Sequence, residues 1–141
     1  MILKNPILAG VIAGIVMGPL MIIMGNITAI QIGFIEPPGG KEIWGPSMFM
    51  LLGLAHISLG VIWGSIFGAI YAFIYDIIPS KGVMKGLYFG LMIWLIKDIA
   101  AGSYTALILV QFQTAINLIY YGFFMWIIYG LVLGYLYKPP K

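Results

Sequence analysis

The sequence predicts an all-α protein, a bundle of four transmembrane helices. Three observations lead to this fold class: an apolar composition, four long apolar segments, and glycines that recur at every fourth position. Of the 141 residues, 62% are hydrophobic and 8% are charged, whereas soluble domains carry about 25% charged residues. The mean hydropathy is +1.09. A chain this short has too little interior to hide so much apolar surface, so we expect a single integral membrane domain over residues 1–141.

Four apolar segments are long enough to cross a bilayer, which takes about 20 helical residues. We expect these spans at residues 6–24, 48–75, 83–101 and 114–137. Pro6 suits the first turn of the first helix, and Pro19 should kink that helix or loosen its outer end. The polar stretch at residues 26–47 should form a loop. Residues 102–113 carry no charge, so this connector should lie in the membrane interface or dip into the bilayer.

Glycines at every fourth position leave one bare face on each helix, and we call such a row a glycine stripe. The expected stripes consist of Gly10, Gly14 and Gly18, of Gly60, Gly64 and Gly68, of Gly82, Gly86 and Gly90, and of Gly130 and Gly134, with Gly122 in the same phase. Small residues at this spacing let two helix backbones approach closely within a membrane. We therefore expect the stripes to make helix contacts, within the chain or across an oligomer.

The two halves of the chain resemble each other. The pattern Gly-x3-Gly-x2-Tyr occurs at residues 64–71 and again at residues 130–137. The glycine stripe at residues 10–18 matches the one at residues 82–90. Because each half holds two spans, both halves enter the membrane from the same side, which predicts a parallel two-helix repeat.

The lysines predict the orientation in the membrane. Those on one side are Lys4, Lys81, Lys85, Lys138 and Lys141, and the other side has only Lys41. Loops rich in lysine and arginine stay in the cytoplasm, so both termini should be cytoplasmic. The first span has no small-residue cleavage pattern after it and is interpreted as a retained helix. We expect a multi-pass protein of the inner or plasma membrane.

Three polar residues stand out within the predicted spans: His56, Lys97 and Asp98. A charged residue at the centre of a membrane helix costs about 2.5–3.5 kcal/mol on insertion scales, so it usually faces protein and has a partner. At about 100° per residue, Lys97 lies about 20° from the stripe that ends at Gly90, and Asp98 lies about 80° from it. His56 should lie about 14 Å, and Asp98 about 8 Å, from the outer ends of their helices. This intramembrane cluster predicts either a proton or ion relay or a polar contact that sets helix register.

Little in the sequence indicates catalysis. There is no cysteine, and we find no Ser-His-Asp set, no metal-ligand spacing and no phosphate-binding glycine loop. We expect no enzyme activity, no catalytic residue, no metal and no cofactor. Copper(I) at a methionine row such as Met17 and Met21, or haem shared by His56 of two copies, is less favoured than simple packing. The net charge of +3 is divided between loops and does not indicate nucleic-acid binding.

The segment from Ala55 to Leu91 carries a family resemblance. It contains Ala-His-Ile at residues 55–57, Ile-Ile-Pro-Ser-Lys at residues 77–81 and Lys-Gly-Leu at residues 85–87. This arrangement resembles the YagU-type inner-membrane proteins, a family with no established biochemical activity. The resemblance implies a multi-span inner-membrane protein and supplies no catalytic residue.

Two functions are compatible with this sequence. The first is a structural or accessory subunit of a homo-oligomer or a larger membrane complex, whose partners are the lipid bilayer, other membrane subunits or further copies of itself. The alternative is a minimal transporter or channel for protons, ions or small solutes, with a pathway lined by His56, Lys97 and Asp98. The chain has almost no extramembrane domain and few polar residues in its spans, which favours the first.

Overall fold

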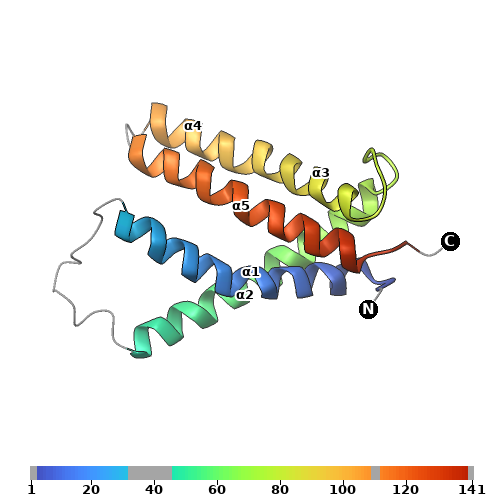
Figure 1. The fold of residues 1–141 in the computed structure, drawn as a ribbon, viewed down its shortest axis with the longest axis horizontal. Coiled ribbons are helices and arrows are strands. Elements are labelled where there is room, and N and C mark those ends of the chain that lie inside the picture. The colour runs from blue at the N-terminus through green and yellow to red at the C-terminus, as the bar shows by residue number, and fades with distance from the viewer. Residues whose placement is uncertain (1–2, 32–45, 109–111, 140–141) are drawn as a thin grey trace.

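The computed structural model describes residues 3–31, 46–108 and 112–139, and within these ranges the protein is all-α. The helices are α1 (Pro6–Gln31), α2 (Pro46–Ile74), α3 (Val83–Ile93), the π-helical turn η2 (Trp94–Ile99), α4 (Ala100–Leu107) and α5 (Phe112–Leu136). Because α3, η2 and α4 follow one another without a break, the described residues form four helical rods. Figure 1 shows two helical hairpins, α1 with α2 and α3–η2–α4 with α5. The ends at which the two helices of each hairpin are connected lie on the same side of the molecule. Two segments, Gly53–Ile74 and Ala115–Leu136, are long and apolar enough to cross a membrane.

The first helix is longer than the sequence predicts. Asn5 caps it, since its side-chain oxygen accepts hydrogen bonds from the backbone N–H groups of Ile7 (3.0 Å) and Leu8 (3.1 Å). The helix continues through Pro19 to Gln31, beyond the expected end at residue 24. Figure 1 shows its two halves at an angle, as an internal proline favours. Residues 32–45 of the expected polar loop lie outside the described residues.

The prediction of a connector at residues 102–113 is wrong for its first part, because the third helix continues through α4 to Leu107. Nothing between residues 100 and 107 breaks a helix strongly: Gly102 is buried, and Thr105 donates a hydrogen bond from its hydroxyl to the carbonyl oxygen of Ala101 (2.8 Å). A helix satisfies the backbone groups of an apolar segment internally. The third rod therefore matches α5 in length.

The turn between α2 and α3 contains two residues with positive φ, Ser80 (89°) and Gly82 (55°). Only glycine adopts such a conformation without steric cost. Gly82 precedes the first turn of α3, and a β-carbon built on it would meet no described atom within 4 Å. Gly82 therefore does not pack against another helix, in contrast to the expectation that grouped it with the glycine stripes.

The other predicted glycines lie where two backbones meet. A β-carbon built on any of them would meet a neighbouring helix at or below about 3.0 Å, closer than side chains normally pack. In the first hairpin, Gly10 and Gly14 of α1 face Gly60, Gly64 and Gly68 of α2, and Gly18 faces Ile57; in the second, Gly86 and Gly90 of α3 face Trp126, Gly130 and Gly134 of α5. The stripes are thus used within the chain, one pair in each hairpin.

These contacts also show which glycines of the two hairpins occupy equivalent positions. Gly10 faces Gly64 and Gly68, while Gly86 faces Gly130 and Gly134. Gly10 therefore corresponds to Gly86, not to Gly82. The sequence alignment of residues 10–18 with residues 82–90 was therefore wrong by four residues. Glycines at a constant spacing of four align equally well in several registers.

The hairpins meet along α1 and α5. Tyr129 of α5 donates a hydrogen bond from its buried hydroxyl to the carbonyl oxygen of Gly64 in α2 (3.1 Å), and Phe67 packs edge-on against Trp126 with ring centroids 5.0 Å apart. Near the termini, Leu3 pairs with the strand-like end of α5: its N–H donates to the carbonyl oxygen of Leu136 (2.7 Å). These contacts hold the two hairpins together at the end where the chain begins and ends.

Candidate functional site

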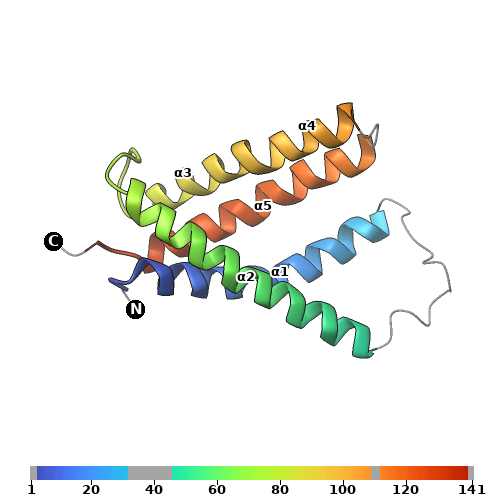
Figure 2. The ribbon, with the colours of Figure 1, turned by 180° about the vertical axis from the view of Figure 1, so that it is seen from behind.

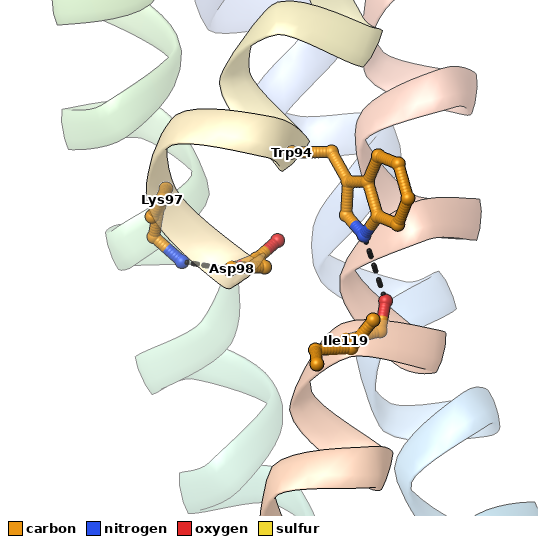
Figure 3. A network of polar contacts seen from close by, with 4 residues as sticks. All are labelled: Trp94, Lys97, Asp98 and Ile119. Atoms are coloured by element: carbon orange, nitrogen blue, oxygen red, sulfur yellow. Dashed lines mark hydrogen bonds and ion pairs between the residues drawn. The ribbon is translucent and has the colours of Figure 1, made fainter. Parts of the chain in front are cut away.

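The candidate site is built on the π-helical turn Trp94–Ile99 in the middle of the third rod. π-Turns are rare and occur often at functional sites. Here the turn has an anchor on α5, because the indole N–H of Trp94 donates a hydrogen bond to the carbonyl oxygen of Ile119 (2.8 Å). Figure 3 shows this bond beside the ion pair between Lys97 and Asp98.

Lys97 and Asp98 form a salt bridge between neighbouring residues. The ammonium of Lys97 lies 2.8 Å from Oδ1 of Asp98, and the two side chains are 48% and 5% exposed. The ammonium also lies 5.4 Å from the centre of the Trp126 ring, a distance typical of a cation–π contact. In this pair, Asp98 is buried and Lys97 is partly exposed.

The π-turn decides which member is buried. In a regular α-helix, Lys97 would continue the face of Gly90 and Asp98 would lie about 80° away from it. A π-turn accommodates one extra residue, which rotates the following positions back by about 100°. Asp98 thereby reaches the face toward α5 and Lys97 leaves it. The sequence expectation, which placed Lys97 on the glycine face, is reversed for this reason.

Asp98 occupies a space that Gly122 leaves open on α5. A β-carbon on Gly122 would overlap Oδ2 and Cγ of Asp98. Oδ2 is buried and has no hydrogen-bond partner among the described residues. Burial of a polar atom without a hydrogen-bond partner costs free energy of folding. This oxygen is therefore a candidate for a functional role. Sequence reasoning noted the phase of Gly122 but did not connect it with Asp98.

A small cavity lies between the two hairpins, beside Lys97. It has a volume of about 120 Å³ and is lined by Gly14, Met17, Leu59, Gly60, Trp63, Gly64, Lys97, Trp126 and Tyr129. We call it the inter-hairpin cavity. Its walls come from α1, α2, η2 and α5, so it exists only because the hairpins pack together. Among the described residues of its wall, Lys97 is the one ionisable cation.

A larger groove, which Lys97 also lines, lies between α2 and the third rod. Its volume is about 410 Å³, and it is lined by Trp63, Phe67, Ile70, Ile74, Phe89, Met92, Ile93, Ile96 and Lys97. We call it the α2–α3 groove. Trp63 and Lys97 border both spaces, so they mark the point where the cavity and the groove adjoin.

His56 lies in α2 and is half-buried. About ten residues, or about 15 Å, separate it from the start of α2, and Asp98 lies about 14 Å before the end of α4, so the two levels are similar. Figure 2 shows that the first half of α2 diverges from α4 and α5. The structure brings Lys97 and Asp98 together, and the membership of His56 in their cluster stays a prediction.

A second polar group lies near the turn that joins the hairpins. Lys85 is buried at the start of α3, and its ammonium donates a hydrogen bond to the carbonyl oxygen of Tyr75 and lies 4.1 Å from the centre of that residue's ring. Tyr71 and Tyr137 complete an aromatic cluster around Tyr75. The sequence analysis used Lys85 only to orient the chain, because nothing in its local pattern shows that a carbonyl at the end of α2 will lie next to it.

The charged groups of this site can bind ions and protons. Among the described residues, no group of three or more histidine, cysteine, aspartate or glutamate side chains could hold a metal ion. The buried carboxylate, the adjoining ammonium and the cavity can bind an ion, a proton or a polar group of a ligand. Comparisons of the chain with protein-family models, with curated proteins and with solved structures find no match.

Proposed function

We propose that the protein is a four-span integral membrane protein that acts as a structural or accessory subunit of a homo-oligomer or a larger membrane complex. Both termini lie in the cytoplasm in this proposal, which follows the distribution of the lysines. The resemblance of residues 55–91 to YagU-type inner-membrane proteins agrees with it. The partners are lipid, further copies of the chain or other membrane subunits.

Membrane insertion is supported by the near absence of charge along the rods. Within the four helical rods, the lysine, arginine, aspartate and glutamate residues are Lys85, Lys97 and Asp98. The helices α1 and α2 contain 26 and 29 residues, about 39 and 44 Å, against a hydrocarbon core of about 30 Å. In the apolar window of α2, only 22% of residues are buried inside the structure, whereas the core helix of a soluble protein would be mostly buried.

The observation that carries the subunit proposal is the uncovered face of α2. Opposite its glycine stripe, α2 exposes the large apolar side chains Leu59, Ile62, Ile66 and Phe73. α2 packs along α1 and makes no comparable contact with α4 or α5 within the described residues. Since the glycine stripes are occupied inside the chain, this bulky exposed face is available to a neighbouring subunit.

Native mass spectrometry after gentle extraction tests the proposal. We expect a defined oligomer or a complex with other membrane subunits. Replacing Ile62 and Phe73 by alanine should reduce the assembly, whereas the matched change of Ile15 and Val16, which are exposed on α1, should not. A parent protein that stays monomeric in both detergent and nanodiscs would contradict the subunit proposal.

A minimal transporter or channel is the second candidate. The salt bridge between Lys97 and Asp98 favours it, because ionisable pairs inside membrane helices often belong to ion or proton pathways. Proton or ion flux into vesicles should then fall in Asp98→Asn and in His56→Ala. Flux that is absent from the parent, or unchanged in both variants, would reject transport and leave the subunit proposal.

A further inference from the structure

The inter-hairpin cavity and the α2–α3 groove share two wall residues, Trp63 and Lys97. The groove wall consists of aromatic and aliphatic side chains together with the methylene stem of Lys97. Along α2 its wall extends from Trp63 to Ile74, a length of about 16 Å at 1.5 Å per residue. A volume of about 410 Å³ lies within the usual range of about 300–1,000 Å³ for ligand pockets. A space of this shape and character fits an extended hydrocarbon chain.

The polar end of the site is the ammonium of Lys97. It lies on the side of the inter-hairpin cavity, because Trp126, whose ring centre is 5.4 Å from it, lines that cavity and not the groove. An ammonium has three donors, and the described structure gives one of them to Oδ1 of Asp98. Asp98 itself is 5% exposed and packs toward α5. A ligand that enters the cavity therefore meets the exposed cation and not the buried carboxylate.

We propose that this site binds a long-chain carboxylate, with its hydrocarbon tail in the α2–α3 groove and its carboxylate in the inter-hairpin cavity on the ammonium of Lys97. Burial of the tail supplies affinity in proportion to its apolar area. A hydrogen bond between two charged groups supplies selectivity, since it is about twice as strong as a neutral one. A neutral amphiphile would lack this bond and a cationic one would be repelled.

Trp63 is central to the geometry because it borders both spaces. It stacks on Phe67 with ring centroids 5.6 Å apart, which positions the two rings along one wall of the groove. The hydrocarbon tail of the ligand would pass from the cavity into the groove beside Trp63 and Lys97. The site requires only the contacts between the two hairpins of one chain, so binding does not depend on the proposed assembly.

The test uses purified protein in nanodiscs of zwitterionic lipid and follows the quenching of tryptophan fluorescence. The probe is dodecanoate brominated next to its carboxylate, and the reference ligand is the methyl ester of the same acid. Bromine then lies near Trp63 and Trp126. We expect the acid to bind at least about tenfold more tightly than the ester, a ratio that corresponds to about 1.4 kcal/mol.

Three variants separate the parts of the site. Lys97→Gln should abolish the preference for the acid, and Lys97→Arg should retain it. Ile70→Trp, which fills the groove without touching the charge, should weaken the binding of acid and ester alike. The matched control is Lys81→Gln, which removes an exposed cation from the turn before α3 and should leave both affinities unchanged.

Three outcomes would overturn the proposal. Equal binding of the acid and the ester to the parent would show that the groove takes any hydrocarbon chain, bulk lipid included. An equal loss in Lys81→Gln and Lys97→Gln would show general attraction of anions to a basic protein. Unchanged binding in Ile70→Trp, in a variant that keeps the helical content of the parent, would place the probe elsewhere.

Discussion

Asp98 and Gly122 share one space between the third helical rod and α5. The carboxylate of Asp98 lies where a side chain at residue 122 would start, and a β-carbon there would overlap Oδ2. The glycine is thus the complement of the buried carboxylate. This relationship explains how the side chain of Asp98 fits between the third rod and α5.

Gly122→Ala should therefore destabilise the protein by about 1–3 kcal/mol, the usual cost of overpacking. The measurement is reversible denaturation in mild detergent, followed by circular dichroism. The matched control, Ser103→Ala on the exposed face of α4, should have little effect. When Asp98 is already replaced by alanine, Gly122→Ala should reduce the free energy of unfolding by less than it does in the parent. If the losses of the two single variants simply add in the double variant, the direct contact is contradicted.

The glycine contact in the first hairpin predicts a larger effect from a larger side chain. A β-carbon on Gly64 would overlap the carbonyl oxygen of Gly10, so Gly64→Leu must separate α1 from α2. We expect a loss of at least about 1–3 kcal/mol in the free energy of unfolding. The control Ala69→Leu adds bulk at an exposed position of the same helix. Equal stability of these two variants would mean that α2 does not contact α1 through its glycines.

The hydrogen bond from Tyr129 to Gly64 joins the two hairpins. Tyr129→Phe removes the hydroxyl and leaves the buried carbonyl oxygen of Gly64 without this donor. A loss of about 0.5–1.5 kcal/mol in unfolding free energy is expected for one hydrogen bond. Tyr135→Phe removes a hydroxyl from an exposed ring and should be neutral. A result in which both substitutions are neutral would argue against this contact between the hairpins.

Membrane topology can be measured with single cysteines, because the chain contains none. Ile108→Cys, after the end of α4, should react with an impermeant thiol reagent added to the outside of intact cells. Lys81→Cys, in the turn between α2 and α3, should react only after the membrane is opened. The lysine distribution is the reason for this orientation. The opposite labelling pattern would invert the proposed topology.

The expectation of an all-α protein is confirmed, and it rested on local properties. Apolar residues without breakers form helices wherever the backbone must satisfy its own hydrogen bonds. The ends of the helices were harder to predict. The sequence between Ala100 and Leu107 has neither charge nor proline, and in the folded chain Gly102 packs against Ile119 and Ala115 of α5.

The sequence by itself determined that this chain forms long apolar helices with bare glycine faces, because composition and spacing are properties of each segment alone. Only the tertiary structure decided which residues meet. It paired Gly10 with Gly64 and Gly68, a register that repeated glycines leave open. It also placed Asp98 rather than Lys97 against α5, because the π-turn adds one residue to a turn of the third rod. At this turn, Trp94 bonds to Ile119 and Asp98 packs on Gly122, both of α5. Such a shift depends on contacts between distant segments, and no periodicity within the third helix reveals it.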